Sequence, residues 1–226
     1  MSRRAIIILV SAIVVVLVGG GLAIAWAAGL FDDPPPKAAL GDCASSGGGG
    51  SADGSWKVRT GTGFVGYRMK ELFGGATIKR TAAGRTSDVT GTMTIDGTKV
   101  NAAEITADLS TLSSDKVARD TAIHDQGLET DKFPKSTFTL ATAATLPSVP
   151  AQGKAVKATV HGELDLHGQK KPVTVPVEAC WTGKVVKVSG SAPVVLADYG
   201  IDAISTPIVK IDDLGSFEFE LTFVPA

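Results

Sequence analysis

Apolar and polar residues alternate along most of the chain from residue 56 to residue 226, which is the spacing of β-strands with one buried face. The clearest case is "KAVKATVHGELDLHG" at residues 154–168. Its apolar face is formed by Val156, Ala158, Val160, Gly162, Leu164 and Leu166. In "SFEFELTFV", Phe217, Phe219, Leu221 and Phe223 alternate with Glu218, Glu220 and Thr222. Both segments are therefore predicted to be half-buried strands.

The same alternation recurs in five further segments, separated by turn-forming residues such as Asp96–Gly97, Gly168 and Gly183. These segments are residues 90–96, 103–112, 136–146, 171–181 and 183–196. Closure into an antiparallel barrel or a two-sheet sandwich would remove the exposed strand edges. The predicted fold class is therefore all-β.

One segment, "SSDKVARDTAIHDQGLET" at residues 113–130, predicts a helix instead. Ser113 and Ser114 can cap its first turn, Asp115 suits that turn, and Gly127 can end it in a left-handed conformation. A helix of this length is short, and we expect it to lie across one end of the barrel.

The N-terminal region is of a different kind, because residues 5–30 contain no charged side chain. A helix of that length is long enough to cross a bilayer. Arginines at positions 3 and 4 precede it and aspartates at positions 32 and 33 follow it, so residues 1–4 are expected in the cytoplasm and the rest outside. We therefore predict a single-pass signal anchor in a cell membrane. The alternative is a signal peptide cleaved near residues 25–27, which would release a secreted protein.

Residues 31–55 form a linker rich in proline, glycine and serine, predicted to be a stiff polyproline spacer followed by a flexible tether. The chain has two cysteines, Cys43 in this linker and Cys180 in the predicted barrel domain of residues 56–226. A disulfide between them would suit an extracytoplasmic compartment. Two unpaired thiols are the alternative.

A glycine motif, "GTGFVG" at residues 61–66, matches the G-x-G-x-x-G loop of dinucleotide-binding proteins. That loop requires a helix after it and then a parallel strand. Here "YRMKELFGG" follows, which is too short for such a helix, and the next elements alternate like antiparallel strands. We therefore predict no nucleotide cofactor. The glycines are expected to let the first strand bend, or to leave space beside a ligand.

Charge and motifs limit the other functions. The chain has 22 lysines and arginines against 23 aspartates and glutamates, so no strongly basic surface favours nucleic acid. Hydrolase, metalloprotease and P-loop motifs are absent from the sequence. His161, Glu163, Asp165 and His167 share one strand face, but the outer two are about 20 Å apart, too far to bind one ion. We expect a solvated outer face there, no metal site and no enzyme. A metal held by His161 and Glu163 with help from another strand is the alternative.

From Trp56 to its end, the chain resembles the YceI-like family of periplasmic or secreted polyisoprenoid-binding proteins. The segments that carry the resemblance are "WKV…GFVGYRMKELFGG", "RDTAIHDQGLETDKFPKSTFTL", "HGELDLHGQKKPVTVPV" and "ADYGI", which occur in the order found in the family. The sequence departs from the family at residues 59–63, where "RTGTG" replaces a stretch that often carries aspartate and histidine. A polar contact near the pocket mouth is expected to be missing.

The resemblance implies a bacterial cell-envelope protein with an extended lipocalin-like antiparallel barrel that encloses a long isoprenoid lipid, such as a quinone or a polyprenyl lipid, without a cofactor. Whether the protein forms a homodimer stays open. Alternation and residue type suggest these apolar residues as walls of the binding site: Phe64, Met69, Met93, Ile95, Leu109, Phe138, Leu164, Trp181 and Phe219. Two rival hypotheses are a barrel with a solid core that acts as an interaction module, and a lipid- or quinone-modifying enzyme that uses His161 or His167.

Overall fold

The computed structural model describes residues 33–226 apart from residues 49, 74–77 and 208. The predicted cytoplasmic stub and transmembrane helix, residues 1–4 and 5–30, lie outside the described residues. Within the described part of the chain, no helix combines the length and the hydropathy needed to span a bilayer. A compact unit begins at Pro35 and runs to Ala226, so it includes most of the predicted linker.

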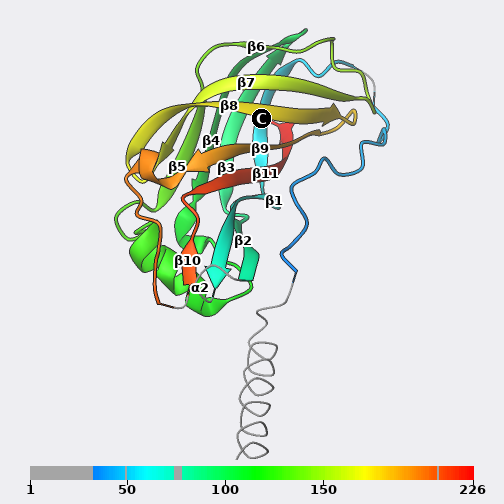
Figure 1. Ribbon diagram of the computed structural model, residues 1–226. Helices are drawn as coiled ribbons and strands as arrows, with labels where there is room; N and C mark the ends of the chain where they lie inside the picture. The colour runs from blue at the N-terminus through cyan, green and yellow to red at the C-terminus, as the bar shows by residue number, and fades with distance from the viewer. Residues whose placement is uncertain (1–32, 49, 74–77, 208) are drawn as a thin grey trace, which may run out of the picture. The chain divides into compact units, whose positions relative to one another are not determined.

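The centre of this unit is a closed antiparallel β-barrel (Figure 1). Its eight strands are β1 (Gly54–Phe73), β3 (Val89–Asp96), β4 (Lys99–Asp108), β5 (Lys135–Leu140), β7 (Ala155–Leu166), β8 (Gln169–Trp181), β9 (Val186–Val195) and β11 (Leu214–Pro225). Around the barrel they follow the order β1-β11-β9-β8-β7-β5-β4-β3, and β3 pairs again with β1. That last pairing closes the sheet and confirms the predicted all-β barrel.

Strand β1 bends after the residues that close the barrel and changes partners on one of its edges. Its first residues, Gly54–Lys57, pair with β3, whereas Val65–Phe73 pair with β2 (Ile78–Thr86). The pairing register with β11 shifts between Val58 and Gly63, and Gly63 has a φ of 88°. A Cβ at Gly63 would collide with the carbonyl oxygen of Glu220. The glycine motif therefore serves the bend of a strand, one of the two roles that the sequence suggests.

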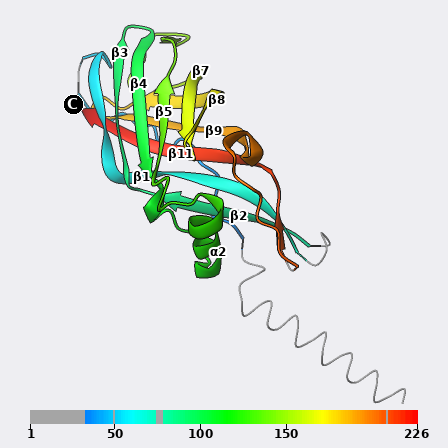
Figure 2. The same ribbon diagram turned by 90° about the vertical axis from the view of Figure 1, so that its left-hand side faces the viewer.

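Further elements flank the eight barrel strands. They are β2, β6 (Ala144–Thr145), β10 (Val209–Ile211), the helix α2 (Val117–Ala122), and the turns η1 (Leu109–Thr111), η2 (Ile123–Gly127) and η3 (Leu196–Tyr199). Figure 2 shows α2 below one end of the barrel, on the side where β2 extends away from it. The predicted helix thus exists and its helical run ends at Gly127, but Lys116 is its N-cap and Glu129 takes the positive φ of 45°.

Two parts of the sheet are not evident in the sequence. The second half of β1 and the whole of β2 lack regular alternation, since consecutive residues Ala82 and Ala83 are both buried in β2. These strands pair with each other beyond the barrel, and at Ala82 and Ala83 both faces of the ribbon are covered. Alternation therefore fails as a signal there.

The barrel interior contains two clusters of buried apolar side chains. The larger includes Trp56, Met93, Trp181, Leu221 and Phe223. The smaller is formed by Leu164, Val194, Tyr199 and Ile201, with Phe138 packed against it. Part of the barrel is therefore a filled core of the ordinary kind.

Residues 35–46, which we call the strap, lie along the outer wall of the barrel, although the sequence predicts a stiff polyproline spacer followed by a flexible tether (Figure 1). Arg68 donates to the carbonyl oxygens of Pro35 and Pro36 at 2.8 and 3.1 Å, and Arg85 also donates to Pro36. Farther along, Lys187 Nζ donates to the carbonyl oxygen of Asp42 at 2.6 Å. Proline carbonyls in an extended segment are free to accept such bonds, which gives the strap a fixed path.

Glu218 of β11 is the central residue beneath the strap. Its side chain is placed on the outer face, as the sequence predicts, yet the residue is only 1% exposed. It forms ion pairs with Arg68 at 3.0 Å and Arg85 at 3.1 Å, and it accepts from the Ala38 N–H at 3.3 Å. Burial alone would raise the pKa of this carboxyl, but these partners outweigh burial and the pKa is lowered.

Glu218→Gln tests this ion-pair cluster. Loss of the charge leaves two arginines without their buried partner, so we expect the free energy of unfolding at neutral pH to fall by about 3 kcal/mol. Because the folded pKa is lowered, the charge stabilises above the ordinary value of 4.5, and this contribution disappears as the pH falls through the folded pKa. The difference between wild type and variant in urea unfolding should therefore vanish in acid.

Glu163→Gln is the matched control, since its side chain is 50% exposed in a loose 3.7 Å pair with Lys170. We expect a change below about 1 kcal/mol at any pH. Equal effects of the two substitutions would contradict a stabilising role for Glu218.

Candidate functional site

An apolar cavity of about 110 Å³ lies inside the barrel. Residues of β3, β4, β5, β7, β8, β9 and β11 line it, together with Ala52, Leu146 and Pro150 from the adjoining loops. None of the lining residues is charged. A site with this lining excludes ions and favours hydrocarbon, because burial of an ion in a space without partners is costly.

Five of the residues suggested by the sequence line this cavity. They are Met93 and Ile95 of β3, Phe138 of β5, Trp181 of β8 and Phe219 of β11. The five come from four strands, and the closure of the barrel brings them to one space. Their alternation along each strand places them on the inner face.

Phe64 and Met69 do not line the cavity. Phe64 follows the register shift in β1, which reverses the inward and outward positions, so that Val65 packs against the core instead. The guanidinium of Arg85 lies 3.7 Å from the centre of the Phe64 ring. Met69 is buried, but it lies where β1 has left the barrel to pair with β2, and its sulfur packs at Gly215 of β11.

Leu109 and Leu164 also lie outside the cavity lining, in packed regions of the core. Leu109 belongs to the turn η1 after β4 and packs in the larger core cluster. Leu164 faces inward on β7, as predicted, but it packs with Val194, Tyr199 and Ile201 in the smaller cluster. The alternation identifies which side chains of a strand point inward, but it does not identify which level along the barrel axis is hollow.

Other lining residues could have been found by the same signal. Val177 and Ala179 precede Trp181 at the same spacing, and Leu221 and Phe223 follow Phe219. Leu221 and Phe223 belong to the apolar face predicted for their strand, and the alternation predicted for residues 171–181 extends to Val177 and Ala179, although none of the four was suggested as a wall. Ala52 could not be found in this way, because it lies in the predicted linker and yet is 1% exposed within the core.

Two glycines position the aromatic walls. The ring of Phe219 lies across Gly190 of β9, where an added Cβ would come within 2.7 Å of the ring. The ring of Phe138 occupies the corresponding space at Gly162 of β7. The absence of a side chain at these glycines lets each ring lie close to the wall. This is the physical reason for two glycines inside otherwise regular strands.

The two histidines of the rival enzyme hypothesis, His161 and His167, do not line the cavity. His161 is exposed on the outer face and bonds Thr174 Oγ1 at 3.0 Å. His167 is held by the Tyr199 carbonyl at 3.2 Å and by Glu129 at 3.1 Å, next to the Phe133 ring. Within the described ranges, no three His, Cys, Asp or Glu side chains gather in a way that could hold a metal ion.

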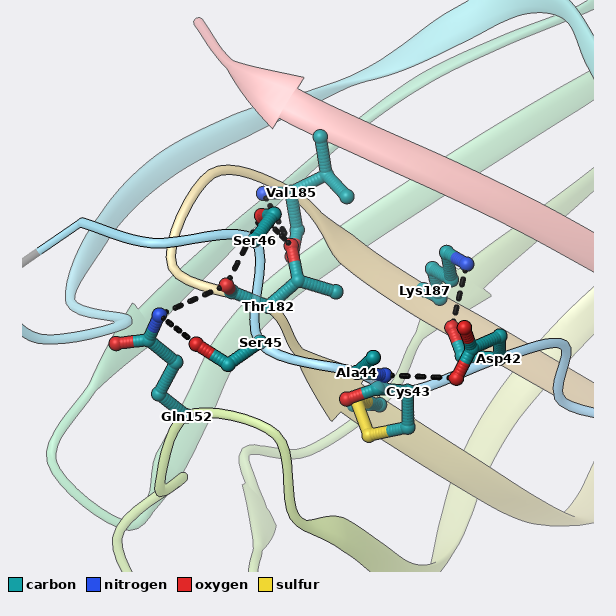
Figure 3. The surroundings of a disulfide bond; sticks show 10 residues. Asp42, Cys43, Ala44, Ser45, Ser46, Gln152, Thr182, Val185 and Lys187 are labelled. Atoms are coloured by element: carbon teal, nitrogen blue, oxygen red, sulfur yellow. Dashed lines mark hydrogen bonds between the residues drawn. A yellow bond between two sulfur atoms is a disulfide. The ribbon is translucent and has the colours of Figure 1, made fainter.

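Figure 3 shows the strap from Asp42 to Ser46 lying against Gln152, Thr182 and Lys187 around the disulfide. Cys43 forms a disulfide with Cys180, with a Cα–Cα distance of 5.9 Å. Ser46 donates from its N–H and its Oγ to the Thr182 carbonyl, at 2.9 and 3.0 Å. Gln152 also donates to that carbonyl at 3.0 Å. Of the two cysteine states left open by the sequence, the structure has the disulfide.

The chain belongs to the YceI-like family, because the YceI-like domain profile matches residues 56–223. A polyisoprenoid binding domain from Saccharophagus degradans, implicated in plant cell wall breakdown, has a similar fold, with a TM-score of 0.57 and 15% identity over 76% of this chain and 98% of that one. BcnA from Burkholderia cenocepacia gives a TM-score of 0.54 and 17% identity over 73% and 98%. At these identities the likeness concerns the fold. A search of curated proteins finds no match.

Cys43→Ser tests the contribution of the disulfide. The bond joins residues 137 apart in sequence, so its loss should lower the free energy of unfolding by about 2–4 kcal/mol. Chemical denaturation with and without a reducing agent measures this effect. Reductant should destabilise the wild type to the level of the variant and leave the variant unchanged. Equal stability of oxidised wild type and variant would contradict the prediction.

Proposed function

We propose that this protein binds an isoprenoid lipid inside its barrel and performs no chemistry on it. The observation that carries the proposal is the uncharged apolar lining of the interior cavity. Transfer of each methylene group from water to such a space is favourable by about 0.8 kcal/mol, so an isoprenoid tail needs no further attraction. Membership of the YceI-like family and the fold shared with a polyisoprenoid binding domain support the proposal.

The cavity must widen to take a long tail. Its volume of about 110 Å³ is below the roughly 150 Å³ of an engineered cavity that binds benzene, so it has space for about one isoprene unit. Met93 is the most adaptable wall residue, since a thioether chain changes rotamer at little cost. A tail of several units would displace Met93 and the rings of Phe138 and Phe219.

The same small volume supports a second candidate function. A barrel whose interior stays filled would act as an interaction module of the cell envelope, with its loops as the contact surface. The two functions differ in what the interior does when an isoprenoid is offered. Native mass spectrometry after incubation with an isoprenoid ketone such as farnesylacetone separates them, because only the binding protein gains the mass of the ligand.

Ala179→Phe provides the matching test by mutation, because this alanine lines the cavity on β8. An added ring fills the space that the ligand would use, so we expect farnesylacetone affinity to fall more than tenfold while the barrel stays folded. Lys157→Phe adds a ring to the outer face of the neighbouring strand and should leave affinity unchanged. Equal binding by both variants would reject the cavity as the site.

We also propose that residues 5–30 tether the barrel to a membrane, with the barrel on the extracytoplasmic side. The uncharged run and the flanking charges support this orientation. The full chain should remain in the membrane fraction after a high-salt wash, and protease added outside the cell should digest its barrel. Recovery of a shortened chain from the medium would show instead that the segment is a cleaved signal.

A further inference from the structure

Trp181 is an exception in the cavity wall because it carries a hydrogen-bond donor. The residue is 6% exposed and its side chain belongs to the larger core cluster. Its indole Nε1 is buried and finds no acceptor among the residues that the structure describes. No other lining side chain has an N–H or O–H group, since the Cys180 sulfur is bound in the disulfide.

Trp56 shows how a buried indole is ordinarily accommodated in this protein. It lies in the same core cluster as Trp181, but its Nε1 donates to the carbonyl oxygen of Ala52 at 2.9 Å. A buried donor without an acceptor is destabilising, whereas an apolar side chain at the same place has no such donor to satisfy. The unpaired N–H of Trp181 therefore destabilises the barrel, and an apolar ligand would not remove this destabilisation because it offers no acceptor.

We propose that Trp181 selects lipids that carry an uncharged hydrogen-bond acceptor, such as the carbonyl of a prenylated ketone or quinone. This proposal rests on the proposed function and names the ligand class for the same site. Because the indole N–H is buried in the cavity wall, the proposal requires that the widening for a longer ligand also brings its oxygen to the indole edge. An ionised phosphate does not fit this role, because no charged residue lines the cavity to compensate it.

The strand register sets the orientation of such a ligand. Trp181 lies at the end of β8 where the strap is bound, and it pairs with Val186 of β9. Val175 lies nearer the start of β8, and it pairs with Val160 of β7. Phe138 on β5 lies beyond them, beside the smaller core cluster. The acceptor therefore occupies the strap end of the cavity, and the tail extends toward Val160 and Phe138.

The test compares farnesylacetone with the hydrocarbon of the same carbon skeleton in the wild type and in Trp181→Phe. Both ligands lose apolar contact in the variant, so the ratio of their affinities isolates the hydrogen bond. We expect the preference for the ketone to fall about tenfold, which is the value of one net hydrogen bond. Trp56→Phe is the control, since that indole already has an acceptor, and its ratio should equal that of the wild type.

A second measurement uses the unmutated barrel and is independent of how the variants fold. In ¹⁵N-labelled protein, the indole proton of Trp181 should shift downfield with farnesylacetone and not with the hydrocarbon, while the Trp56 signal serves as internal reference. Three outcomes would overturn the proposal and leave lipid binding intact. They are a tight ketone complex with no shift of the Trp181 indole proton, an unchanged affinity ratio in Trp181→Phe, and equally tight binding of farnesyl phosphate. If neither ketone nor hydrocarbon binds the wild type, the proposed function fails as well.

Discussion

The pairing of β1 with both β11 and β3 is the constraint on which the rest of the structure depends. Without it the sheet would have two open edges, and the apolar inner faces of eight strands would have no common interior. Both pairings are already made before the glycines, because Gly54–Lys57 pair with β3 and Trp56–Val58 with β11. The register shift between Val58 and Gly63 then carries β1 away from β3 toward β2, while its pairing with β11 continues. A nucleotide-binding fingerprint and a strand bend thus share the same glycine spacing, but the fingerprint needs a helix after the glycines, whereas the bend is followed by more strand, up to Phe73.

Much of the barrel follows from the sequence because its strands bury one face each. The alternation in residues 154–168 and 216–224 gives β7 and β11, and with them the inward position of Phe219. Local irregularities limit this reasoning. The bulge in β1 turns Phe64 outward, and the departure of β1 from the barrel removes Met69 from the cavity, although both residues have the right chemistry. Neither the bulge nor the height of the hollow section leaves a periodic signal in the chain.

The outer wall shows a second limit of sequence reasoning, which concerns contacts between distant residues. Glu218 lies where alternation predicts a solvated carboxylate, but the strap covers it and two arginines pair with it. The strap itself has the composition of a disordered linker. It is ordered by bonds to Arg68 and Lys187 and by the disulfide, all of which depend on residues that only the folded barrel brings together. A segment that buries little apolar surface can therefore still be fixed by polar and covalent contacts.

The hollow interior and the strap are connected through residues 180–182, on both sides of Trp181. Cys180 before it is bonded to Cys43, and Thr182 after it accepts from Ser46, so the strap restrains the residues on both sides of the unpaired indole. Cys180 and Trp181 both line the cavity, so the disulfide fixes the cavity wall directly beside the indole. A donor must be held in place before the ligand arrives if its hydrogen bond is to contribute fully to affinity. The externally bound strap thus restrains the one lining side chain that carries a hydrogen-bond donor, in a cavity whose lining residues are all uncharged.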